Sequence, residues 1–163
     1  MSGPTKIWTC AAFSPVYRCG GWASVRFSQG QTSGVAGGQR NTTASRIALA
    51  GLVAGLCDLP PGEVVDIRTT SGELAEFANI FARLETQTQA PAPTEDLDLW
   101  AQILSASAGR RLTLVRVSLE TTTPTAFANA WAELARDKAK ATGGFSSAIP
   151  KPNLAKIPGL SSA

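Results

Sequence analysis

Some residues that support common chemistries are absent or scarce in this chain of 163 residues. It has no histidine, so a cysteine nucleophile would have no imidazole base beside it to lower its pKa. Its cysteines, Cys10, Cys19 and Cys57, have no zinc-like spacing, and we interpret them as reduced and mostly buried thiols. No apolar run approaches the roughly 20 residues that cross a bilayer, and no basic-then-apolar leader opens the chain. We therefore expect a cytoplasmic protein without a membrane partner.

Acidic residues are missing from the first third of the chain. The first of them is Asp58, and the segment before it contains five bases: Lys6, Arg18, Arg26, Arg40 and Arg46. A segment of only positive charge favours polyanions such as nucleic acid. Five charges spread over this length are also typical of a lightly charged surface, so both interpretations stay open.

Hydrophobic patterning predicts one α/β domain over residues 1–142. Short β-branched and aromatic runs at 6–12 and 22–27, and a glycine-rich run at 31–38, favour three antiparallel strands. The remaining pattern predicts helices near 43–56, 71–84, 96–105 and 123–142, with strands at 63–69 and 111–117. The strand at 63–69, the turn that follows it and the amphipathic helix near 71–84 indicate a parallel crossover.

Residues 143–163 are rich in proline and serine, and three prolines exclude a continuous helix there. Spaced hydrophobic residues favour docking on this domain or on a partner: Phe145, Ile149, Leu154, Ile157 and Leu160. We expect a C-terminal tail that is either flexible or docked on a partner.

Four segments carry a family resemblance in order and spacing: Ile7-Trp8-Thr9-Cys10, Gly20-Gly21-Trp22, Thr42-Thr43-Ala44-Ser45-Arg46-Ile47-Ala48-Leu49 and Glu133-Leu134-Ala135-Arg136. They resemble the ribonuclease H family, which writes them aromatic-Thr-Asp-Gly-Ser, Gly-Gly-Tyr, Thr-Thr-Asn-Asn-Arg-Met-Glu-Leu and Asp-Glu-Leu-Ala-Arg. The resemblance implies a ribonuclease H-like five-stranded mixed sheet, three antiparallel strands followed by parallel crossovers, flanked by helices.

The family's catalytic carboxylates are absent at the matching positions. The resemblance implies two magnesium ions held by four carboxylates to cut the RNA strand of an RNA–DNA hybrid. Those positions are Cys10, Ala48, Thr70 and Ala132 here, and the family's loop histidine has no counterpart. Asp66 lies on the face of Thr70, but one carboxylate does not hold two ions. We expect no metal, no other cofactor and no enzyme activity.

The family's substrate contacts are only partly retained. The asparagine that touches the RNA sugar is matched by Val16, and the asparagine pair that reads the minor groove by Ala44-Ser45. Thr43, which in the family helps to seat a DNA phosphate, is kept. Sequence-independent phosphate contact is therefore predicted for a set of four residues: Arg18, Arg40, Thr43 and Arg46.

Three functions stay open from the sequence. The first is a non-catalytic binding or scaffold subunit, with an unidentified protein partner, in a nucleic-acid-processing complex. The second is direct, sequence-independent nucleic-acid binding through the positive N-terminal segment. The third is another enzyme chemistry based on Cys10, although this thiol is better interpreted as an apolar residue that fills the vacated metal position.

Overall fold

The computed structural model describes residues 5–28, 30–57, 59, 64–72, 74, 96–107, 111–117 and 123–157. The helix predicted near 71–84 falls largely outside these residues. Leu74 is described and lies buried in the core.

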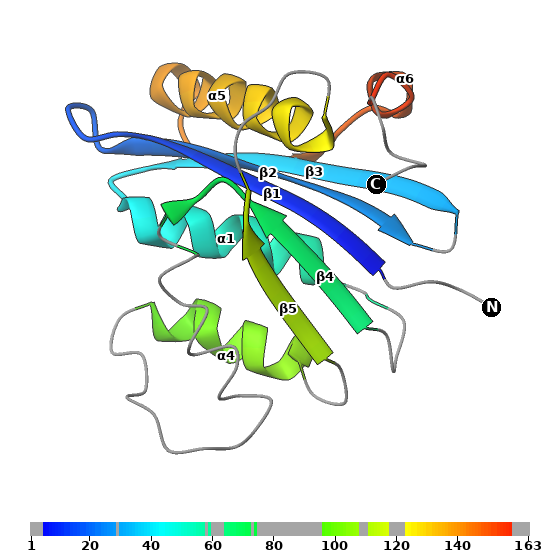
Figure 1. Ribbon diagram of the computed structural model, residues 1–163. Helices are drawn as coiled ribbons and strands as arrows, with labels where there is room; N and C mark the ends of the chain where they lie inside the picture. Colours follow the sequence, from blue (N-terminus) through cyan, green and yellow to red (C-terminus); the bar gives the residue numbers. More distant parts are fainter. Residues whose placement is uncertain are drawn as a thin grey trace.

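The described strands form one six-stranded mixed sheet in the order β5-β4-β1-β2-β3-β6 (Figure 1). The strands are β1 (Thr5–Ser14), β2 (Cys19–Ser28), β3 (Gln31–Arg40), β4 (Val64–Thr69), β5 (Arg111–Arg116) and β6 (Phe145–Ala148). Strands β1, β2 and β3 are antiparallel neighbours, whereas β4 runs parallel to β1 and β5 runs parallel to β4. This arrangement confirms the predicted ribonuclease H-like fold class.

Helices cover both faces of the sheet. Helices α1 (Ala44–Leu56) and α4 (Leu97–Ser107) lie on one face, and α5 (Pro124–Thr142) lies on the other with α6 (Lys151–Leu154) beside it (Figure 1). A threonine caps the start of each of α1 and α5, because the hydroxyl of Thr43 accepts from the amide of Arg46 and that of Thr123 accepts from the amide of Ala126, both at 3.2 Å. Gly143 ends α5 with a φ of 94°, a conformation that glycine adopts readily.

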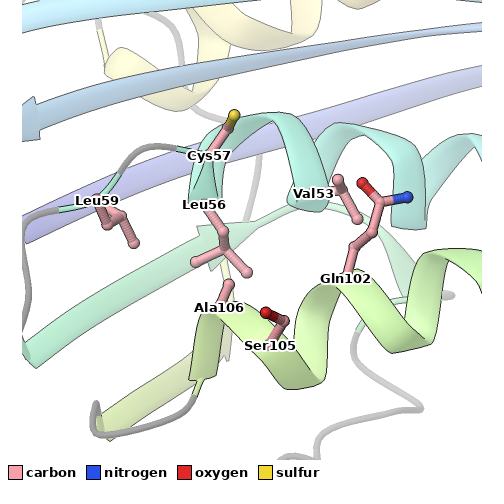
Figure 2. Close-up of a pocket in the computed structure, with 7 residues that line it drawn as sticks. All are labelled: Val53, Leu56, Cys57, Leu59, Gln102, Ser105 and Ala106. Carbon is pink, nitrogen blue, oxygen red and sulfur yellow. The ribbon is translucent and has the colours of Figure 1, made fainter.

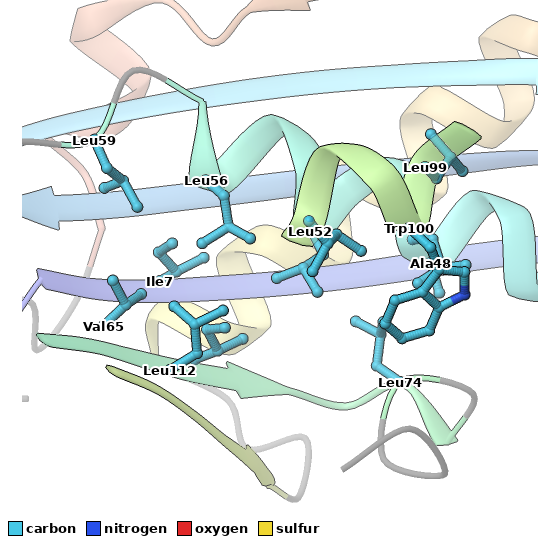
Figure 3. Close-up of a cluster of buried hydrophobic side chains, with 13 residues drawn as sticks. Ile7, Ala48, Leu52, Leu56, Leu59, Val65, Leu74, Leu99, Trp100 and Leu112 are labelled. Carbon is cyan, nitrogen blue, oxygen red and sulfur yellow. The ribbon is translucent and has the colours of Figure 1, made fainter. Parts of the chain in front are cut away.

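Alternation along β1 divides the core into two layers. Ile7 points towards α1 and α4, whereas Trp8 and Cys10 point towards α5, because successive side chains of a strand face opposite sides. The layer under α1 and α4 is shown in Figure 3 and includes Ile7, Ala48, Leu52, Leu56, Val65, Leu74, Trp100 and Leu112. The layer under α5 and α6 includes Trp8, Cys10, Val25, Ala132, Ile149, Leu154 and Ile157.

Small residues bring the backbone of α5 onto the sheet. The buried face of α5 includes a row of alanines: Ala128, Ala132, Ala135 and Ala139. They face the glycines of β2 and β3. A Cβ atom added at Gly21 would overlap the backbone nitrogen of Arg136 and lie 2.5 Å from the carbonyl oxygen of Ala132. No space for a larger side chain therefore remains at this contact.

The segment from Phe145 to Ile157 belongs to the domain, which corrects the prediction of a flexible or partner-docked tail. β6 pairs antiparallel with β3 and adds the sixth strand that the sequence pattern did not reveal. Ile149, Leu154 and Ile157 are buried in the α5 layer, and the first two pack over Gly34. This one segment pairs with the edge of β3 and also covers apolar surface in the α5 layer. Leu160 lies outside the described residues.

Within the described part of the chain, no helix is both long enough and apolar enough to cross a membrane.

Candidate functional site

The four positions that match the family carboxylates lie on four different elements. Cys10 is on β1, Ala48 on α1, Thr70 directly after β4, and Ala132 on α5. Cys10 and Ala48 are each 1% exposed and Ala132 is 0% exposed, while Thr70 is half-buried. Cys10 and Ala132 belong to the core layer under α5, but Ala48 belongs to the layer under α1. Three of the four positions are therefore part of the packed core.

Cys10 sits in a neutral environment. The hydroxyl of Thr70 donates a hydrogen bond to its Sγ at 3.4 Å, and the thiol donates to the carbonyl oxygen of Thr125 at 3.5 Å. Burial raises the pKa of Cys10, and the bond from Thr70 offsets this only in part. A buried thiol with a raised pKa stays protonated and is a poor nucleophile. Cys10 is therefore better interpreted as a small residue that fills space in the core.

The donor set at these positions does not fit magnesium, which binds carboxylate, carbonyl and water oxygens. The positions that the resemblance matches to the family's carboxylates carry a thiol, two methyl groups and one hydroxyl. Asp66, the nearby acid on β4, is half-buried and accepts from Arg68 at 3.4 Å. The described residues include no group of three or more His, Cys, Asp or Glu side chains that could hold a metal ion.

Arg46 and Thr43, two of the residues predicted to contact phosphate, are engaged within the fold. Arg46 forms a two-pronged ion pair with Asp98, at 3.0 and 2.7 Å, and also reaches Asp96 at 3.2 Å. These bonds raise the pKa of Arg46 and lower that of Asp98 to about 2. The Thr43 hydroxyl caps α1. Both side chains fasten the start of α1, and Arg46 links it to α4.

Arg18 and Arg40 are brought together at one end of the sheet. The pairing of Cys19 with Arg40 places the tip of the β1–β2 hairpin beside the end of β3. The amide of Thr42 donates to the carbonyl oxygen of Arg18 at 3.1 Å and fixes this tip, where Arg18 has a φ of 51°. Both arginine side chains are exposed. Neither has an ion-pair partner among the described residues.

Sequence reasoning missed that α5 contributes two lysines to the same end. The Nζ of Lys140 lies 3.6 Å from the centre of the Tyr17 ring in the hairpin, and the Nζ of Lys138 lies 4.4 Å from that of Phe145. Figure 1 shows the hairpin tip and the C-terminal end of α5 at this end of the molecule. We call Arg18, Arg40, Lys138 and Lys140 the basic end. The two lysines were visible in the sequence, but only the packing of α5 places them beside the hairpin.

A pocket of about 370 Å³ lies between α1 and α4, and Figure 2 shows its lining. It is lined by Val53, Leu56, Cys57, Leu59, Gln102, Ser105 and Ala106. None of these residues is among the predicted site residues, and none is a carboxylate or a base. The pocket is separate from both the four substituted positions and the basic end.

Comparison with known proteins gives one relative in sequence and several in structure. No family model matches the chain. A ribonuclease H of Gluconobacter oxydans is 28% identical over 106 residues, which are 63% of this chain and 71% of that protein. The N-terminal RNase H domain of a Mycobacterium tuberculosis protein has a TM-score of 0.63 at 16% identity, covering 85% of this chain and 96% of its own. Another RNase H, solved in complex with an RNA/DNA hybrid, has a TM-score of 0.57 at 19% identity and covers 83% and 98%.

These comparisons confirm the resemblance and correct one prediction. The relative in sequence and the neighbours in structure are ribonuclease H enzymes, which contradicts the prediction that the chain is not an enzyme. The replaced carboxylates led to that prediction. Four residue identities describe one site, however, whereas the comparisons concern most of the chain and point to a nuclease family.

Proposed function

We propose, from the premise that this chain is a ribonuclease H-like protein, that it binds duplex nucleic acid, an RNA–DNA hybrid in the first place, without reading its sequence. The observation that supports this most is the basic end, where a hairpin turn, the end of β3 and helix α5 present four exposed cations. A structural neighbour was solved with an RNA/DNA hybrid, which supports the choice of ligand for this fold.

The charge balance of this end favours a polyanion. Asp137 lies on the same turn of α5 as Lys138, but it is paired with Arg136 at 3.2 Å. The four cations of the basic end therefore keep a positive excess. Lysine and arginine contacts to phosphates position a protein on a duplex but carry no sequence information. Binding of this kind is driven by counterion release and weakens steeply with salt.

The test is a salt series of binding to a short fluorescent RNA–DNA hybrid, followed by anisotropy. The variant K138Q/K140Q removes two cations from the basic end, and K151Q/K156Q removes two exposed lysines of the α6 segment as the matched control. If both lysines contact phosphates, the slope of log K against log salt should fall by about 1.8. The control should keep the wild-type slope. Equal losses in both variants, or no salt-dependent binding by the wild type, would contradict the proposal.

We propose, as a second candidate, a scaffold role towards an unidentified protein within a nucleic-acid-processing assembly. The outer face of α5 supports it, because Leu134 is 61% exposed beside the half-buried Trp131, whose ring lies 6.2 Å from that of Phe127. Exposed apolar groups at helical spacing are typical of partner contacts.

The corresponding test is quantitative affinity purification with Leu134→Glu. Leu97→Glu on α4 is the matched control, since Leu97 is 59% exposed. A partner retained by wild type and by the control, but lost by Leu134→Glu, is the expected result. Retention by both variants would contradict a role for this face.

We also propose that Cys10, Ala48, Thr70 and Ala132 hold no metal ion, since hard divalent cations need several oxygen ligands close together. Melting temperatures measured with and without millimolar Mg²⁺ test this directly, as described in the Discussion.

A further inference from the structure

We infer that Tyr17 is a stacking platform for an unpaired nucleobase, so that the preferred ligand is a hybrid with a single-stranded extension. This inference rests on the proposed nucleic-acid binding and specifies the form of its ligand.

Tyr17 lies outside the core, in the turn of the β1–β2 hairpin. It lies in the turn between Ser14 and Cys19, which pair across the hairpin. Its side chain is 57% exposed and that of its neighbour Val16 is 83% exposed. Neither belongs to the described core clusters. The hairpin tip therefore presents an apolar and aromatic surface to solvent.

The ammonium group of Lys140 lies over the Tyr17 ring. The ammonium lies 3.6 Å from the ring centre, which places a cation on one face of the ring. The exposed remainder of the ring is available to a second planar group. An ordered aromatic side chain loses little conformational entropy on binding, and this favours affinity.

An unpaired base offers a free face to such a ring, whereas bases in the interior of a duplex are already stacked on both sides. Proteins that bind single strands combine a positive surface with aromatic rings on which bases stack. Both parts are present here, since Arg18 follows Tyr17 in the chain and Arg40 pairs with Cys19, the residue after Arg18, across β2 and β3. The cations would contact the phosphates that flank the stacked base.

The experiment compares three ligands by fluorescence anisotropy at one salt concentration. They are a blunt hybrid, the same hybrid with a single-stranded extension, and the same hybrid with an extension of abasic residues. The abasic extension keeps the phosphates and removes the bases. We expect the extension with bases to bind at least roughly fivefold more tightly than the abasic one, which is the lower end of the effect of one stacked base.

Two substitutions of Tyr17 separate stacking from other effects. Tyr17→Phe keeps the ring and should keep the difference, whereas Tyr17→Leu should abolish it and leave the affinity for the blunt hybrid unchanged. Val16→Ala serves as the control within the same turn. Melting temperatures should be unchanged in all three variants, because both positions are exposed.

The outcomes distinguish the inference from the function on which it rests. Equal binding of the base-containing and abasic extensions would overturn the stacking inference while leaving duplex binding intact. An equal loss for all ligands in Tyr17→Leu would do the same. No binding of any hybrid by the wild type would overturn the proposed function, and the inference with it.

Discussion

Cys10→Asp restores the first of the family's four carboxylates at a position that this fold has closed. The side chain is 1% exposed and faces the carbonyl oxygen of Thr125 at 3.5 Å. That oxygen repels a carboxylate anion, whereas the hydroxyl of Thr70 can donate to it. Burial should therefore raise the pKa of the new carboxyl well above its value in the unfolded chain, as it does for the thiol that is present now.

The size of the effect follows from the pKa change. Fully buried carboxyl groups shift by roughly 3 to 5 units, and the Thr70 hydroxyl offsets part of this, so we take about 2 units. At about 1.36 kcal/mol per unit, the charge costs about 2.7 kcal/mol at neutral pH. Because the folded pKa is the raised one, this cost is absent below the unfolded pKa of about 4. It grows as pH rises towards the folded pKa, near 6, and is fully present above it.

The assay is urea unfolding of Cys10→Asp and Cys10→Asn as a function of pH. The asparagine variant carries the same shape without the charge, so the difference between the two isolates the ionisation. We expect the two variants to be equally stable near pH 4 and to differ by about 2.7 kcal/mol above pH 7. If the two variants were equally stable at both pH values, the carboxylate would be hydrated. Position 10 would then not be closed to water, as we argue it is.

The remaining predictions concern metal, packing, the tail and the surface ion pair. Millimolar Mg²⁺ should leave the melting temperature of the wild type unchanged, and that of Cys10→Asp as well, since three ligand positions stay without carboxylates; a rise of several degrees would reveal a metal site. Gly21→Ala should unfold the protein or cost more than about 3 kcal/mol, because the backbone of α5 occupies the Cβ position, whereas Gly144→Ala should change stability in urea by less than about 1 kcal/mol. Truncation after residue 144 removes the buried side chains of Ile149, Leu154 and Ile157, uncovers the apolar surface on which they pack, and should cost about 5 kcal/mol. Asp98 has a pKa of about 2, so the stability difference between wild type and Asp98→Asn should be present above pH 4 and disappear as pH falls towards 2; a difference that persists at pH 2 would contradict the ion-pair origin.

The fold was predictable wherever local chemistry and pattern agreed. Thr43 and Thr123 cap their helices, Gly143 ends α5, and β1, β4 and β5 follow runs rich in β-branched and other apolar residues. β6 was not predictable from local pattern, because Phe145-Ser146-Ser147-Ala148 has no strand-like alternation. It is a strand because it pairs with the edge of β3 and because Ile149 and Leu154, which follow it, pack over Gly34.

Some features of the candidate site were likewise predictable from the sequence, and others depended on tertiary contacts. The identities at positions 10, 48, 70 and 132 are sequence facts, and none of these four side chains is a carboxylate of the kind that binds magnesium. The sequence also establishes that no acid accompanies the first five bases. Which of those bases are available was decided by tertiary contacts, since Arg46 is bound by Asp98 from another helix while Arg18 and Arg40 stay exposed. Lys140 meets Tyr17 more than a hundred residues away only because glycines and alanines let α5 lie against the sheet. The sequence determines which residues are charged. Packing between distant segments determines which charges are paired and which lie together on the surface.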